Sequence, residues 1–376
     1  MNLEFTEEMM MLQDSLHKFL QNEYDFETRQ SLSRTGIGYS EDHWQNFAEM
    51  GLLGVPFDEE YGGFGFGQTG LIVVMEAIGK GLIVEPYLAS VVLGGLLVQR
   101  AGNEEQKEAI LPALIAGELK LAFAYVERHS RYNLTDVQFK AEKKGQQYCL
   151  SGEKSVVFNA ETADKIIVSA RTSGDNLTPQ GLTLFIVDKD AEGLSCRHYE
   201  TVDGLRASEL SFDNVMVDEK AVVGKLGSAY PDIEYVIDAA AAAISAEAVG
   251  VVKELREKTV EYLKTRKQFD QPIGNFQVLQ HRCVDMFMTE EQMRSLSYLA
   301  AIKVADGEAE ERIKSVSAAK VYLGDARAIV AEQAAQLHGG IGVTDELDVA
   351  HYVKRLTMMN TLFGDRDYHL QRFGQF

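Results

Sequence analysis

The feature that most constrains the fold of this sequence is a long run, residues 232–267, that contains no proline and a single glycine, Gly250. A continuous helix of roughly 35 residues is about 50 Å long at 1.5 Å per residue. Such a helix is much longer than the average in globular proteins. It needs other long helices to cover its apolar face, which predicts a helical bundle of a kind often shared between subunits.

Residues 1 to about 120 also follow a helical pattern. Thr6 stands before two glutamates, which is typical of a helix N-terminus. Further helices are expected over residues 41–50, 70–78 and 104–117, the last with a kink at Pro112. The apolar face expected on the first helix consists of Met9, Leu12, Leu16, Phe19 and Leu20.

The middle of the chain, residues 121–227, changes to short segments rich in Val, Ile, Phe and Thr, with Asn, Asp and Gly between them. This pattern predicts a small β-barrel or sandwich. We therefore expect an α+β, mostly α, protein with an N-terminal helical domain (1–120), a middle β-domain (121–227) and a C-terminal four-helix bundle (228–376). The expected strands are 121–125, 146–150, 165–169, 182–187 and 209–217.

Composition excludes several classes of function. The formal net charge of −20 argues against nucleic-acid binding, which needs a basic face. The three cysteines, Cys149, Cys196 and Cys283, lie far apart, so neither a disulfide framework nor a metal site is indicated, and a reducing cytoplasm is expected. Charged residues break the most apolar runs, so no membrane span is expected.

Two segments of the last third carry unusual polar and glycine-rich patterns. The first contains Arg266, Gln268 and Phe269, followed by Phe276 and Gln277. A basic helix end and a Pro-Gly turn explain its charges, but not the two phenylalanines. The planar fork of an arginine suits a pyrophosphate.

The second segment runs Gln336-Leu337-His338-Gly339-Gly340. A glycine pair lets the backbone approach a phosphate and present N–H donors. The simpler interpretation is an ordinary helix C-cap with glycine in the left-handed conformation. The two segments together favour a phosphate site.

In order and spacing these segments resemble the two flavin-contacting signatures of the acyl-CoA dehydrogenase family. The resemblance implies that both contact the ADP half of an FAD held by a neighbouring subunit, with Thr135 and Phe158 of the β-domain also near the cofactor. It implies α,β-dehydrogenation of an acyl-CoA thioester and electron transfer to an electron-transferring flavoprotein. Implied cofactor contacts are Arg266, Gln268, Phe269, Phe276, Gln277, Gln336, Leu337, His338, Gly339, Gly340, Thr135 and Phe158.

The family also implies a carboxylate that removes the α-proton of the substrate, and alignment of the terminal Leu-Gln-Arg assigns Asp365 to that role. The alternative interpretation is a solvated acidic turn in which Asp365, Arg366 and Asp367 pair locally. The other family position for the base lies on the long helix, where this chain has only alanines beside Asp238.

The sequence departs from the family in the β-domain. Val156 and Phe158 stand where members have the tryptophan and threonine that contact the flavin ring. The overall pattern, which includes residues 127–132 and Leu362-Phe363-Gly364-Asp365, resembles the small subunit of pimeloyl-CoA dehydrogenase, and this implies a homo- or hetero-tetramer with a homologous subunit. Two alternatives stay open: a non-catalytic partner subunit that supplies only ADP contacts, and a nitroalkane-oxidase-like or flavin monooxygenase-like reaction on the same fold.

Overall fold

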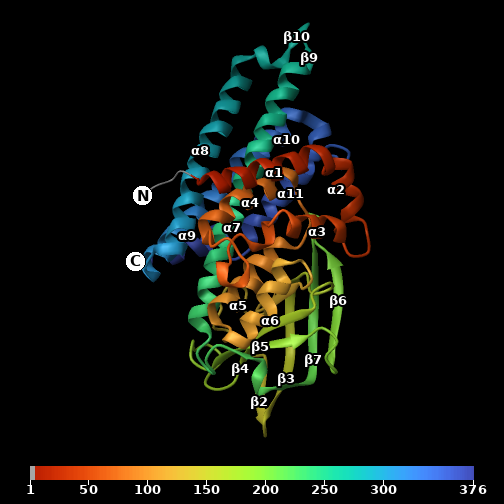
Figure 1. Ribbon diagram of the computed structural model, residues 1–376. Coiled ribbons are helices and arrows are strands. Elements are labelled where there is room, and N and C mark those ends of the chain that lie inside the picture. The colour runs from red at the N-terminus through yellow and green to blue at the C-terminus, as the bar shows by residue number, and fades with distance from the viewer. Residues whose placement is uncertain (1–4) are drawn as a thin grey trace. The chain divides into compact units, whose positions relative to one another are not determined.

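The computed structural model describes residues 5–376 (Figure 1). The chain forms two compact units that are each discontinuous in sequence. Unit 1 contains residues 5–31, Gln68–Ile83 and Ala241–Phe376, and unit 2 contains Leu32–Gly67 and Val84–Ala240. The long helix α7 (Tyr230–Thr265) begins in unit 2 and continues into unit 1.

Unit 1 is built from helices that pack around α7. Its apolar cluster draws on α7, α8, α9, α10 and α11, and includes Leu255, Met293, Leu323 and Leu356. The remaining helices of the unit are α1 (Glu7–Glu23), α2 (Phe26–Ser33), α4 (Gly67–Gly81), α8 (Gln277–Asp306), α9 (Ala309–Ala326), α10 (Glu332–His338), α11 (Asp348–Thr361) and α12 (Arg366–Phe373), with the hairpin β9 (Lys267–Gln268) and β10 (Gln271–Pro272).

Helices α4 and α7 cross with their backbones in contact. A Cβ added at Gly79 of α4 would lie 1.9 Å from the carbonyl oxygen of Glu247, and one added at Gly250 of α7 would lie 1.9 Å from that of Glu76. No side chain fits at either position. Helix α11 is joined to the same part of α7 by a buried pair, in which Arg355 Nε and Nη2 donate to the two carboxylate oxygens of Glu247 at 2.7 and 2.8 Å.

Unit 2 carries the β-structure. Seven strands follow the order β6-β7-β3-β2-β4-β5-β8, and β1 pairs in parallel with β4. The strands are β1 (Leu121–Ala124), β2 (Lys140–Lys144), β3 (Gln147–Phe158), β4 (Lys165–Arg171), β5 (Leu182–Asp188), β6 (Leu194–Glu200), β7 (Arg206–Asp218) and β8 (Val222–Val223); the helices are α3 (Glu41–Glu49), α5 (Leu96–Ala101) and α6 (Glu104–Ile115).

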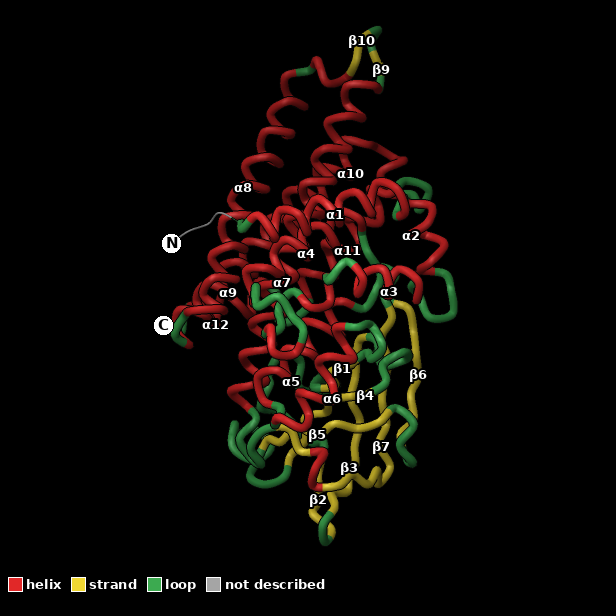
Figure 2. The backbone as a smooth tube through the Cα atoms, in the orientation of Figure 1, coloured by secondary structure: helices red, strands yellow, loops and turns green. Residues whose placement is uncertain are grey.

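The expected fold class is confirmed, with differences in detail. Thr6 caps α1 by accepting from Met9 N, and four of the five expected face residues are buried, Leu20 being half-buried. The sequence did not predict β2 and β6. Both are polar: β6 is an edge strand whose side chains are mostly exposed, so it lacks the alternation of apolar and polar residues that marks a half-buried strand (Figure 2).

Helix α7 is, within residues 5–376, the one helix long and apolar enough to cross a membrane by composition. Of its apolar window, 94% is buried inside the structure, as in the core helix of a bundle. The expected long helix is therefore present, and its apolar character is explained by packing.

The backbone contact between α4 and α7 predicts a large effect of one methyl group. We expect Gly250→Ala to lower the free energy of unfolding by about 1–3 kcal/mol, because the added Cβ forces the two helices apart. Alanine has a higher intrinsic helix propensity than glycine by about 1 kcal/mol, which would stabilise the variant. The expected loss is the net effect after this gain. Urea unfolding measures the difference. The control is Gly36→Ala, where nothing lies within 4 Å of the added Cβ; equal midpoints for both variants would contradict the crossing.

Candidate functional site

The hairpin that follows α7 holds the first signature in an unusual backbone conformation. Phe269 and Asp270 form its two-residue turn, with φ angles of 54° and 60°. Hairpin turns of this length favour glycine or asparagine at such positions, because other side chains are strained there. Phe269 is nonetheless 84% exposed, and its ring makes a T-shaped contact with that of Phe276, with ring centroids 6.0 Å apart. A strained, exposed aromatic residue is typical of a binding position.

Arg266 lies between the end of α7 and this hairpin. Its carbonyl accepts from Ile273 N at 2.9 Å, so its backbone is fixed. Its side chain is exposed, and within residues 5–376 the guanidinium has no carboxylate partner. Gln277, the first residue of α8, is also exposed, whereas the Gln268 side chain folds back onto the Lys267 carbonyl at 2.8 Å. The guanidinium is thus available to an anion from outside the chain.

The second signature ends α10 with an open glycine turn. Gly339 has φ 67° and ψ −150°, a conformation that is almost exclusive to glycine. Nothing lies within 4 Å of a Cβ added at Gly339 or at Gly340, so both glycines border open space. Gln336 is exposed one turn earlier, whereas Leu337 and His338 are buried in unit 1. His338 Nδ1 contacts the Ala334 carbonyl at 2.8 Å.

The two signatures meet within unit 1. The ring of Tyr262, near the end of α7, lies 4.5 Å from that of His338 at the end of α10. Beneath these rings, Leu263 and Leu337 belong to the same apolar cluster. An unpaired guanidinium, exposed amide side chains, an exposed aromatic ring and an open glycine turn therefore share one end of the unit (Figure 1). This donor set fits the pyrophosphate and adenine of a dinucleotide.

The residues expected at the flavin ring lie apart from this region in sequence and in unit, at the end of β3 in unit 2. Val156 has a φ of 53°, which a β-branched residue rarely adopts, at an irregularity in the pairing of β3 with β7. Phe158 is half-buried, and Nδ2 of the following residue, Asn159, is buried without an acceptor among the described residues. That unpaired donor was not singled out from the sequence. The Thr135 hydroxyl donates to Asn133 Oδ1 at 2.8 Å.

Glu127, in the segment that follows β1, has a structural role. Its carboxylate accepts from Lys154 Nζ at 2.8 Å and from the backbone N–H of Gln138 at 2.9 Å. Lys154 is fully buried, which lowers the pKa of its ammonium to about 8 even though Glu127 acts in the opposite direction. Both groups are occupied with each other, so neither contributes to a ligand site.

Asp365 stands in the turn between α11 and α12. It is the N-cap of α12: Oδ1 accepts from Tyr368 N at 2.9 Å, and the side chain is half-buried. The turn is tight, because Phe363 has φ 57° and Gly364 has φ 112°. A Cβ on Gly364 would lie 2.4 Å from Tyr368 Cδ1. Of the local pairing in the alternative interpretation, the contact of Arg366 Nη1 with Asp367 Oδ1 is present at 3.5 Å, while Arg366 Nε donates to Asp325 Oδ1 at 2.6 Å.

A buried histidine supports this turn and was not predicted from the sequence. His369 is 1% exposed; its Nε2–H donates to the Phe363 carbonyl at 3.0 Å, and its Nδ1 accepts from the Ser317 hydroxyl at 3.2 Å. Burial lowers the pKa of His369 to about 3, and the charge of Lys320 acts in the same direction. The imidazole is therefore neutral at ordinary pH.

The Asp365 turn and the glycine turn lie at opposite ends of unit 1. Helix α12 packs against α9, and a Cβ on Gly324 of α9 would touch Arg366. From Gly324 the chain stays helical through α10 to His338. At 1.5 Å per residue this distance is about 20 Å. The Asp365 turn and the glycine turn, which we call the two half-sites, are thus separate regions of the unit.

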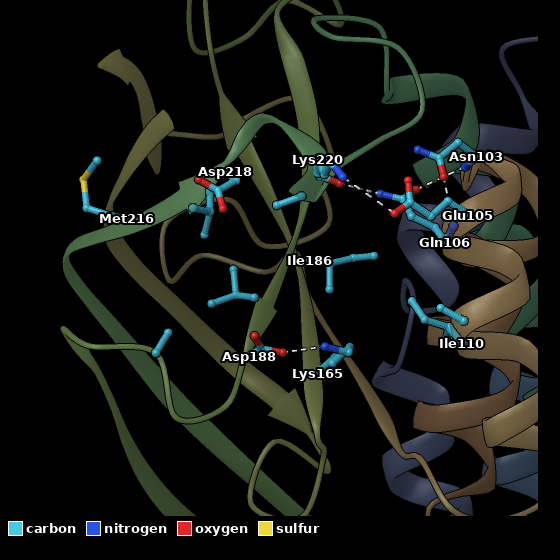
Figure 3. A pocket seen from close by; sticks show the side chains of 15 residues that line it. Asn103, Glu105, Gln106, Ile110, Lys165, Ile186, Asp188, Met216, Asp218 and Lys220 are labelled. Atoms are coloured by element: carbon cyan, nitrogen blue, oxygen red, sulfur yellow. Dashed lines mark hydrogen bonds and ion pairs between the residues drawn. The ribbon is translucent and has the colours of Figure 1, made fainter. Parts of the chain in front are cut away.

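Unit 2 contains a pocket of about 420 Å³ that involves none of these residues (Figure 3). It lies between the start of α6 and strands β4, β5 and β7. One wall carries the ion pair of Lys165 with Asp188, and Gln106 is held by the carbonyls of Lys220 and Val222. No residue predicted for the site lines it.

Comparison with known proteins covers nearly the whole chain. Residues 6–118, 122–215 and 231–375 match the profiles described as the N-terminal, middle and C-terminal domains of acyl-CoA dehydrogenase. An acyl-CoA dehydrogenase of Bacillus subtilis is 31% identical over 318 residues, 82% of each chain. The chain belongs to the acyl-CoA dehydrogenase family.

Two solved structures that are similar to this acyl-CoA dehydrogenase each carry the names of two proteins. A variant of the Tcur3481–Tcur3483 steroid ACAD is 29% identical with a TM-score of 0.88, over 98% of this chain and 97% of that one. The ChsE4–ChsE5 complex from Mycobacterium tuberculosis is 25% identical with a TM-score of 0.90, over 100% and 98%.

Family membership confirms several expectations from the sequence. The protein is a flavoprotein oxidoreductase with FAD as its cofactor, and its reaction is the α,β-dehydrogenation of an acyl-CoA thioester. A tetramer is typical of the family. The role of each site residue and the three domain boundaries stay predictions.

The low pKa of His369 predicts acid sensitivity. Between pH 6.5 and 3 the unfolded chain binds a proton that the folded chain excludes, so stability is lost as the pH falls, by up to about 1.4 kcal/mol per pH unit. We expect the stability advantage of the wild type over His369→Gln to shrink by roughly 2 kcal/mol between pH 7 and pH 5. Urea unfolding at both pH values measures it. His281→Gln, on the exposed face of α8, is the control; an advantage independent of pH would contradict the prediction.

Proposed function

We propose that Asp365 is the base of this acyl-CoA dehydrogenase and removes the α-proton of the acyl thioester. The observation that carries the proposal is its position: a half-buried carboxylate on a fixed turn between α11 and α12. Oδ1 is held by Tyr368 N, so the carboxylate has one orientation, and Oδ2 is the oxygen that takes the proton. Bound FAD supplies the acceptor for the hydride that leaves the β-carbon.

We further propose that the chain lends its ADP-binding end to the FAD of a neighbouring subunit. In this arrangement Arg266 binds the pyrophosphate, Phe269 and Phe276 contact the adenosine, and Gln277, Gln336 and the Gly339–Gly340 backbone donate hydrogen bonds. The separation of about 20 Å between this end and Asp365 supports two distinct FAD molecules, one at each end.

The surface of unit 1 supports an assembly. Helix α8 exposes a row of large apolar side chains at helical spacing, Val284, Phe287 and Met288, each about half exposed. Such a row is costly in water unless another subunit covers it. The likeness to two structures that are each named after a pair of proteins favours a homologous partner, with a homo-tetramer as the other arrangement. We place the assembly in the cytoplasm, with an electron-transferring flavoprotein as its electron acceptor.

A second candidate, a non-catalytic partner subunit, is favoured by specific observations. Asp365 already caps a helix, and Val156 and Phe158 replace the family's aromatic cover and hydroxyl. In that case the chain would supply ADP contacts only, and all chemistry would occur in the partner. Substitution of Asp365 separates the two candidates.

We expect Asp365→Asn to leave the FAD content of the assembly unchanged and to slow anaerobic bleaching of the flavin by acyl-CoA at least about 1,000-fold, because the amide cannot accept the proton. Asparagine is as good an N-cap as aspartate, so the turn is preserved. Stopped-flow absorbance measures the rate.

Asp367→Asn is the matched control, since it removes the same charge two residues further along the chain. The Asp367 side chain is exposed, and its Oδ1 lies 3.5 Å from Arg366 Nη1. Bleaching at the wild-type rate is expected there. If Asp365→Asn also bleaches at the wild-type rate, Asp365 is not the base and the first proposal fails.

We expect Arg266→Ala to weaken FAD binding by the assembly about 10- to 100-fold, and Arg266→Lys to weaken it almost as much, because an ammonium lacks the bidentate fork. Fluorescence titration of the apo-assembly with FAD measures the affinity. Lys264→Ala is the control, since Lys264 carries the same charge two residues earlier and pairs with Glu261. Equal losses for Arg266→Ala and Lys264→Ala would indicate a general effect of charge and contradict the pyrophosphate contact.

A further inference from the structure

Lys320, on α9, is a fully buried lysine without a carboxylate partner. Its side chain is 0% exposed, and within residues 5–376 it makes no ion pair. Lysine is almost never fully buried unless it is paired, because the ammonium loses its hydration. Burial lowers the pKa of Lys320 to about 7, while the charge of Asp365 raises it. A group this costly to bury needs a compensating interaction.

That interaction is with the end of helix α11. Lys320 Nζ donates to the carbonyls of Met359 and Leu362, both at 2.7 Å, and lies 3.5 Å from the carbonyl of Asn360. The last carbonyls of a helix lack partners within the helix and carry its partial negative charge. One ammonium therefore binds the carbonyls of Met359 and Leu362 at the end of α11.

This contact also affects the position of Asp365, which lies three residues beyond Leu362. The carbonyl of Phe363 is held by His369, and the Asp365 carbonyl accepts from His369 N at 3.1 Å. The turn is therefore fixed on its far side by α12 and on its near side by Lys320. Without Lys320, nothing described in the structure would hold the Leu362 carbonyl that begins the turn.

We infer that Lys320 is a positioning residue for the proton-abstracting carboxylate: it anchors the end of α11 and thereby sets where the Asp365 carboxylate lies. This inference rests on the proposed role of Asp365. An aspartate is one methylene shorter than a glutamate, so its reach depends more strongly on the backbone. A displacement of about 1 Å at a catalytic group costs roughly 100-fold in rate.

The test uses the complete FAD-loaded assembly with Lys320→Met, which keeps an unbranched side chain one atom shorter and removes its donors. Two measurements are made: hydrogen exchange of the peptide that covers residues 359–369, and the rate of anaerobic bleaching by acyl-CoA. We expect exchange at least about tenfold faster in this peptide only, bleaching about 100-fold slower, and an acyl-CoA dissociation constant within twofold of the wild type.

Lys314→Met is the matched control, because Lys314 lies on the same helix and pairs with Glu310 at the surface, away from the end of α11. It should leave both measurements unchanged. Lys320→Gln retains N–H donors without a charge and should give intermediate values; it also provides the test if Lys320→Met does not fold.

The outcomes separate the inference from the proposed function. Unchanged exchange in a folded Lys320 variant overturns the anchoring role. Faster exchange with bleaching at the wild-type rate overturns the positioning role, while Asp365→Asn still decides whether Asp365 is the base. If Asp365→Asn bleaches normally, the proposed function fails regardless of the exchange result for Lys320.

Discussion

Two glycines, Gly79 on α4 and Gly250 on α7, allow these helices to touch backbone to backbone, and the rest of unit 1 is arranged around this contact. With α7 fixed, Glu247 is placed to receive the fork of Arg355, which ties α11 to the same point. The far end of α7 then carries the Arg266 hairpin, and the far end of α11 carries the Asp365 turn. A single close crossing thus sets the positions of both half-sites.

The two half-sites are built on opposite physical principles. The ADP-binding end leaves its groups unpaired: an exposed guanidinium, an exposed ring on a strained turn, and glycines that border open space. The Asp365 turn leaves almost nothing unpaired, since Lys320, His369 and Tyr368 engage its backbone and its carboxylate. An anion site from which FAD must be exchanged or shared benefits from open donors, whereas a catalytic base benefits from a fixed position.

Much of the fold could be predicted from the sequence, because helical periodicity, the Thr6 cap and the absence of breakers along α7 are local signals. The two signatures could be recognised in the same way, because the residues of each lie close together in the sequence. The polar edge strand β6 could not be predicted, since its pairing with β7 lies in long-range contacts. Lys320 and His369 were missed for a similar reason, because a lysine or a histidine in a helix is usually expected at the surface. The partners that bury them lie far away in the sequence, about 40 residues for Lys320 and about 50 for the Ser317 contact of His369.

The central claim is that a complete FAD site forms only across a subunit boundary, with the ADP-binding end of this chain serving a neighbour. Sedimentation velocity that follows flavin absorbance, over a dilution series that takes the assembly down to single chains, tests it most directly. The account predicts that flavin sediments with dimers or larger assemblies and is released as they dissociate. Flavin that remains bound to the single chain at the lowest concentrations would contradict it.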